Sequence, residues 1–147
     1  MQNSNTEQNY KTLVIIWAAL LFSQIMLLVV VFFAKPEVFR FDSAKPLLGE
    51  NAVLIIAFAF VALANLAFSF VMKKRAFQQA IEKQQIAYVQ TGLILAYAFC
   101  EATSLLGIVL AFAFSYQYFF VWFALGIIGV GLHFPRREDV IAASYKK

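Results

Sequence analysis

Residues 86–114 read IAYVQTGLILAYAFCEATSLLGIVLAFAF, an apolar run that carries a single charged residue, Glu101. A helix crosses the hydrocarbon core of a bilayer with about 20 apolar residues, so this run is long enough to span a membrane. Backbone amides in lipid must be satisfied within the segment itself, which favours a helix over a strand. Three further runs share this character, at about residues 13–34, 52–72 and 116–134. The sequence therefore predicts an all-α protein, a four-span transmembrane helical bundle that forms a single membrane domain over residues 1–147.

The composition excludes several classes of protein. The chain has 147 residues, of which 63% are hydrophobic and 14% charged, whereas a soluble domain is about half apolar and about a quarter charged. Cys100 is the only cysteine and His133 the only histidine, which excludes a disulfide framework and a multi-histidine metal site within one chain. We expect no enzymatic activity, no metal, no cofactor and no nucleic-acid partner. The expected partners are the lipid bilayer and other membrane subunits or copies of the same chain.

The basic residues predict the orientation in the membrane. If the N-terminus lies inside, the outer loops hold Lys35, Arg40 and Lys45. The chain has 12 lysines and arginines, so the remaining nine lie on the inner side. Lysine and arginine accumulate in cytoplasmic loops. We therefore expect both termini to be cytoplasmic, in an integral protein of a bacterial inner membrane.

A faint internal repeat supports two antiparallel hairpins. Shifting the sequence by 79 positions pairs Thr12 with Thr91 and Ala19 with Ala98. The segment Lys73–Gln85 lacks glycine and proline and is rich in helix formers, so the second and third helices are expected to extend beyond the membrane before the chain turns.

The segments at the two membrane surfaces have simple expected roles. Lys35–Glu50 is expected to be a solvated loop, and the aromatic residues from Tyr116 to Trp122 an interfacial belt. For His133 two roles are open: contact with headgroups, or an axial ligand to haem or chlorophyll. The tail after Pro135 is expected to form a short interfacial helix.

Glu101 is the candidate functional residue. A charge at the centre of a membrane helix costs about 2.5–3.5 kcal/mol on insertion scales, and such residues commonly mark function. No lysine or arginine lies within the four runs, so we expect the carboxyl to be protonated or hydrogen-bonded. Tyr97 and Ser104 stand four residues before and three residues after it, on the same helix face. Asn65 is a candidate partner from the second run.

Small residues beside Glu101 predict a helix-contact face. They recur at spacings of three and four, which places them on one side of a helix where backbones approach closely. The members of this stripe are Ala96, Cys100, Thr103, Gly107 and Ala111.

The segment around the carboxylate, Leu93 to Ala111, resembles the carboxylate helix of the proteolipid c subunit of rotary ATP synthases. The shared features are a small and apolar run, then Glu101-Ala102, then Gly107 and a further apolar stretch. The resemblance implies a reversible ion-binding role for Glu101, tuned by Tyr97 and Ser104. Sodium-binding members carry a Ser or Thr directly after the glutamate. Ala102 stands there in this chain, so the resemblance implies a proton.

Two functions remain open on the sequence. In the first, the chain is a proteolipid-like membrane subunit whose Glu101 binds a proton during proton translocation. In the second, it is a structural or assembly subunit of a larger membrane complex, and Glu101 is a hydrogen-bond anchor between helices.

Overall fold

The computed structural model describes residues 2–49 and 51–144, with side chains from Thr6 onward. This part of the chain is all-helical and contains no strand. Its elements are α1 (Gln2–Ala34), η1 (Pro36–Phe39), α2 (Ala52–Lys83), α3 (Ile86–Phe114), α4 (Phe120–Leu132) and α5 (Arg137–Ser144). The prediction of an all-α fold is confirmed.

Three helices, α1, α2 and α3, are long and apolar enough to cross a membrane. Helix α4 is apolar as well, but it has only 13 residues and rises about 20 Å, against about 30 Å for a bilayer core. The expected fourth run at 116–134 is therefore helical over its middle part only. Large apolar side chains such as Phe33, Val53 and Phe60 are more than 70% exposed, which is consistent with contact to lipid.

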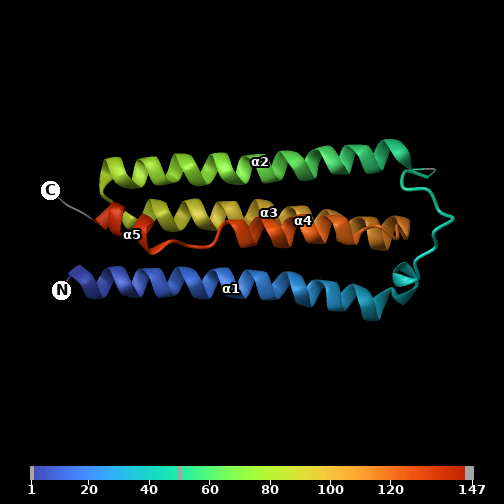
Figure 1. Ribbon diagram of the computed structural model, residues 1–147, viewed down its shortest axis with the longest axis horizontal. Helices are drawn as coiled ribbons and strands as arrows, with labels where there is room; N and C mark the ends of the chain where they lie inside the picture. The colour runs from blue at the N-terminus through green and yellow to red at the C-terminus, as the bar shows by residue number, and fades with distance from the viewer. Residues whose placement is uncertain (1, 50, 145–147) are drawn as a thin grey trace.

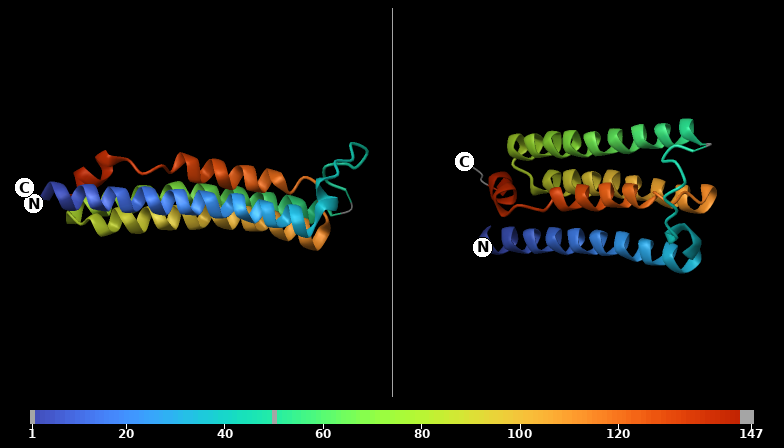
Figure 2. Two further views of the ribbon diagram at one scale, coloured as in Figure 1. Left: turned by 90° about the horizontal axis from the view of Figure 1, so that it is seen from below. Right: turned by 45° about the vertical axis from the view of Figure 1, so that its right-hand side comes forward.

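Helices α1 to α4 do not pack as two equal hairpins. Helices α3 and α4 lie together in the centre, while α1 and α2 flank them on opposite sides (Figure 1). The views in Figure 2 show the same order, with α3 and α4 stacked one over the other. Helix α2 packs extensively on α3, whereas α1 contacts α3 and α4 more sparsely. The internal repeat suggests two hairpins, α1–α2 and α3–α4. Only the second is closely packed, because α3 and α4 lie between α1 and α2.

The turn between α2 and α3 is short and well defined. Helix α2 continues to Lys83, so the Lys73–Gln85 segment is helical, as expected, up to its last two residues. Gln84 adopts the left-handed conformation at φ 52°, and the Gln85 N–H donates to the Ala80 carbonyl over 3.1 Å. This 6→1 bond closes a Schellman-type end and satisfies a carbonyl of the last turn.

Close approach of α3 and α4 depends on glycine. A Cβ atom at Gly126 would lie 2.8 Å from the Cys100 carbonyl oxygen, and one at Gly107 would lie 2.9 Å from the Phe119 carbonyl oxygen. The predicted small-residue stripe faces into this contact region: Ala96, Cys100, Thr103, Gly107 and Ala111 are all buried. Small residues allow the two backbones to approach, which is how helices associate in lipid.

Helix α5 closes one end of the bundle. Val140 and Ala143 are fully buried and pack in a cluster with Leu13, Ala80 and Val89. Arg137 forms an ion pair with Glu7 of α1. The short helix that was expected on the membrane surface is therefore packed into the bundle end, beside the start of α1 and the α2–α3 turn (Figure 1). Tyr145, Lys146 and Lys147 lie outside the described residues.

Candidate functional site

Glu101 lies in the middle of α3. Along the helix axis, Glu101 lies about 14 Å beyond Gly92 and about 20 Å before Phe114. The side chain is half-buried and faces α1, where Ser23 Oγ lies 3.4 Å from Glu101 Oε1. The ion pairs among the described residues are Lys35–Glu37 and Arg137–Glu7. The carboxyl therefore has no cationic partner in the part of the chain that the structure describes.

The Ser23 hydroxyl is shared between two acceptors. It lies 3.4 Å from Glu101 Oε1 and 2.8 Å from the Leu20 carbonyl oxygen of its own helix. A hydroxyl has one proton to donate, so the two acceptors compete for it, and the shorter contact is with the Leu20 carbonyl. Ser23 is therefore a weak donor to the Glu101 carboxyl.

A second polar pair stands beside the first. Ser104 Oγ donates to Gln24 Oε1 over 3.0 Å, and both side chains are fully buried. The Gln24 Nε2 amide has no hydrogen-bond partner among the described residues. Ser23, Gln24, Glu101 and Ser104 form the α1–α3 polar cluster. The Ser23-Gln24 pair was missed by the sequence analysis, although adjacent polar residues in the middle of an apolar run are a usable signal.

Tyr97 does not contact Glu101. Its hydroxyl donates to the His133 carbonyl oxygen over 3.1 Å, at the end of α4. Trp17 Nε1 donates to the nearby Val130 carbonyl oxygen over 2.9 Å. The last carbonyls of a helix lack partners within the helix, and in lipid they need other donors. Side chains from α1 and α3 supply these donors where α4 ends.

Ser104 and Asn65 also differ from their expected roles. The Ser104 hydroxyl is engaged with Gln24 and not with Glu101. Asn65 is half-buried on α2, across the α3–α4 pair from α1 (Figure 1). No hydrogen bond joins Asn65 to Glu101 within the described residues. Of the four expected ion-binding residues, the structure therefore places only Glu101 and Ser104 in the same cluster.

His133, for which headgroup contact and axial ligation were both open, is fully buried within the bundle. Its Nε2 lies 2.8 Å from Ser69 Oγ on α2, and its ring packs against Phe70 with centroids 4.4 Å apart. Ser69 Oγ donates to the Leu66 carbonyl over 2.6 Å. Its single proton is thereby engaged, so His133 donates from Nε2. His133 thus ties the end of α4 to α2.

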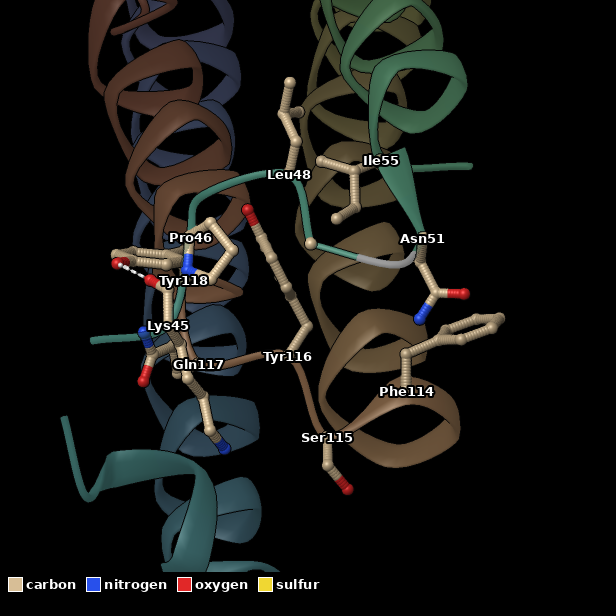
Figure 3. A pocket seen from close by; sticks show the side chains of 11 residues that line it. Lys45, Pro46, Leu48, Asn51, Ile55, Phe114, Ser115, Tyr116, Gln117 and Tyr118 are labelled. Atoms are coloured by element: carbon tan, nitrogen blue, oxygen red, sulfur yellow. Dashed lines mark hydrogen bonds between the residues drawn. The ribbon is translucent and has the colours of Figure 1, made fainter. Parts of the chain in front are cut away.

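The end of the bundle that lies away from both termini carries a loop held by hydrogen bonds (Figure 1; Figure 3). Gln117 binds the backbone of Asp42 twice: Oε1 accepts from the Asp42 N–H over 3.0 Å and Nε2 donates to the Asp42 carbonyl over 2.9 Å. Tyr116 and Tyr118 donate to the carbonyls of Leu47 and Lys45. These tyrosines line a pocket of about 340 Å³ between the loop and the α3–α4 turn. The loop that was expected to be solvated is held by the residues that were expected to form an aromatic belt.

No family model, curated protein or solved structure matches this chain. The fold and the site therefore identify only the general class to which the protein belongs. Three long apolar helices and an all-helical architecture indicate a membrane protein.

Proposed function

We propose that this chain is a membrane subunit in which Glu101 reversibly binds a proton. The observation that carries the proposal is the position of the carboxyl: it is mid-helix and half-buried, it has no ion-pair partner among the described residues, and the Ser23 hydroxyl lies 3.4 Å away. An ionisable group at this depth is commonly functional because it is costly to retain otherwise. Its partial exposure on the side of the bundle leaves a route for proton exchange with a neighbouring subunit.

The proposal includes four membrane crossings with both termini in the cytoplasm of a bacterial cell. The start of α1, the Gln84 turn and α5 lie at one end of the bundle (Figure 1), and most of the basic residues belong to that end. Helix α4 would complete the fourth crossing with its flanking segments. The hydrogen bonds from Trp17 and Tyr97 would satisfy its terminal carbonyls within the membrane.

The resemblance to the rotary ATP synthase proteolipid supports this proposal at one point. In that family a helical hairpin carries the carboxylate on its second helix, after a polar cytoplasmic turn. Helices α2 and α3 pack together over their lengths, are joined by a polar turn at Gln84 and Gln85, and carry Glu101 on the second helix. Proton translocation by an oligomer of such subunits is the corresponding activity.

A structural role is the second candidate, and a specific observation favours it. Helix α1 is the least buried of the three long helices, and its hydrogen bonds to the centre of the bundle are few. Three of them are Ser23–Glu101, Gln24–Ser104 and Trp17–Val130. On this view Glu101 stays protonated and fixes α1 to α3, as polar residues do between helices in lipid.

Infrared spectroscopy of the full chain in lipid vesicles separates the two candidates. A protonated carboxyl gives a carbonyl band distinct from that of a carboxylate, and Glu101→Gln identifies the band by removing it. For proton binding we expect the band to fade reversibly as the pH rises. A band that persists unchanged over the whole pH range in which the protein stays folded would favour the structural role.

Carbodiimide labelling provides an independent measurement. The reagent reacts with protonated carboxyls, so Glu101 should be modified at neutral pH while the exposed Glu37 and Glu82 are not. Labelling of Glu37 and Glu82 without labelling of Glu101 would contradict a neutral carboxyl at this position and would remove the basis of both candidates.

A further inference from the structure

A basic pocket opens between α2 and the segment that joins α4 to α5. It has a volume of about 430 Å³, and its cationic side chains are Lys73, Lys74 and Arg136. Lys73 Nζ lies 5.4 Å from the centroid of the Phe77 ring, which holds the ammonium group over an aromatic face. This pocket is separate from the α1–α3 polar cluster, and the proposed function does not use it.

The positive charge of the pocket is only partly balanced. Asp139 is its one acidic side chain. Neither of the two ion pairs among the described residues includes Lys73, Lys74 or Arg136. With Asp139 ionised, three cations face one carboxylate. Partial burial also raises the pKa of Asp139 above its ordinary value of 3.8, which disfavours its negatively charged form. The pocket therefore carries a net positive charge that an anion would complement.

The other walls of the pocket are apolar and continue onto the side of the bundle. Phe70 is 46% exposed and Leu132 is 63% exposed, and both line the pocket. The Lys73 carbonyl oxygen lies 3.7 Å from the Cβ position at Gly92, where the apolar part of α3 begins after Gln90 and Thr91. The cations thus lie at the edge of the apolar zone, at the depth where lipid phosphates are found.

We propose that this pocket binds one anionic phospholipid of the surrounding bilayer. Lys73, Lys74 and Arg136 bind the phosphate of the headgroup, and an acyl chain lies along Phe70 and Leu132. A free phosphate ion would satisfy the same cations but would leave the apolar walls uncovered. The lipid covers both, because it combines a phosphate and a hydrocarbon chain in one molecule.

Native mass spectrometry of the full chain in detergent tests this site. Phosphatidylglycerol, phosphatidylcholine and inorganic phosphate are added separately, and the bound fraction is measured for each. We expect retention of one phosphatidylglycerol, with weaker binding of phosphatidylcholine and of inorganic phosphate. Lys73→Gln and Arg136→Gln should each weaken phosphatidylglycerol binding by about fivefold, the effect of one cation near a membrane surface.

Arg75→Gln is the matched control, because Arg75 is exposed on the same turn of α2 but does not line the pocket. It should leave binding unchanged, and Asp139→Asn should strengthen it. Three results would overturn the site: equal retention of the two lipids, an equal loss in Arg75→Gln and Arg136→Gln, or phosphate binding as tight as phosphatidylglycerol binding. Arg136 is exposed, so its variant keeps the test valid if Lys73→Gln fails to fold.

Discussion

The indole of Trp17 donates a hydrogen bond to the carbonyl oxygen of Val130, 2.9 Å away and 113 residues later in the chain. A side chain of α1 thereby satisfies the backbone at the end of α4. The same ring packs edge-on against Phe134 with centroids 5.0 Å apart. The Val130 carbonyl also accepts the His133 N–H over 3.1 Å, so Trp17 adds a second, interhelical donor at the end of α4.

Trp17→Phe should destabilise the protein. It keeps an aromatic ring near Phe134 but removes the interhelical donor to the Val130 carbonyl, which retains only the His133 N–H, at a cost of about 1–2 kcal/mol for an interhelical hydrogen bond in lipid. Reversible unfolding in mixed micelles measures the loss. Trp122→Phe is the control, because Trp122 Nε1 lies 3.4 Å from its acceptor, the Phe58 carbonyl. If the two variants lose equal stability, the Trp17 bond has no special role.

Tyr97→Phe should lower stability without changing the Glu101 carboxyl. The Tyr97 hydroxyl serves the His133 carbonyl, so its removal should cost about 1–2 kcal/mol and leave the infrared band of Glu101 in place. Ser23→Ala is the contrasting variant, because Ser23 contacts Glu101 directly. That variant should shift the band. A shift in Tyr97→Phe as large as that in Ser23→Ala would show that Tyr97 tunes the carboxyl after all.

Gly126→Ala should push α3 and α4 apart. The added methyl group would meet Ser104 and the Cys100 carbonyl, and overpacking of this kind costs about 1–3 kcal/mol. Gly131→Ala is a matched control, since no heavy atom lies within 4 Å of a Cβ at that position. Thermal unfolding should show a lower midpoint for Gly126→Ala only. Similar midpoints for the two variants would mean that the helices are not in close contact at Gly126.

Asp139→Asn should raise stability near neutral pH. Burial raises the pKa of Asp139, so the folded state binds the proton more tightly than the unfolded state does. Stability of the parent protein therefore falls as the pH rises from about 3.8 through the raised pKa. The variant should lack this component, and its advantage should vanish at a pH below both values. Thermal unfolding across this pH range measures the effect. Glu82→Gln, which removes an exposed carboxylate, should not reproduce it.

The helices were predictable and their polar contacts were not. Uninterrupted apolar runs determine where α1, α2 and α3 can form, because each run must satisfy its own backbone in lipid. The partner of a polar side chain depends instead on which helices become neighbours. Tyr97 precedes Glu101 by one helical turn, yet its hydroxyl reaches α4, because α4 ends at that level and offers an unpaired carbonyl. The spacing of Tyr97 and Glu101 along one helix could not reveal this competing acceptor on α4.

The same limit applies to the extent of α4 and to His133. Residues 116–134 are apolar apart from the tyrosines, Gln117 and His133, and no proline or charged residue within the run marks that the helix begins only at Phe120 and ends at Leu132. The hydrogen bonds of Tyr116, Gln117 and Tyr118 to the outer loop compete with helix formation at its start. At its end, the Ser69 hydroxyl draws His133 inward. Both effects arise from segments distant in sequence.

The flanking position of α1 has a consequence for biosynthesis. A chain is made from its N-terminus, so α1 enters the membrane before α2, α3 and α4. Its binding surface is built from α3 and α4, and the carbonyl that Trp17 binds does not exist until residue 130 has been translated. Helix α1 is therefore inserted before the surface on which it packs has been made. Until then Gln24 and Ser23 are exposed to lipid or to the insertion machinery.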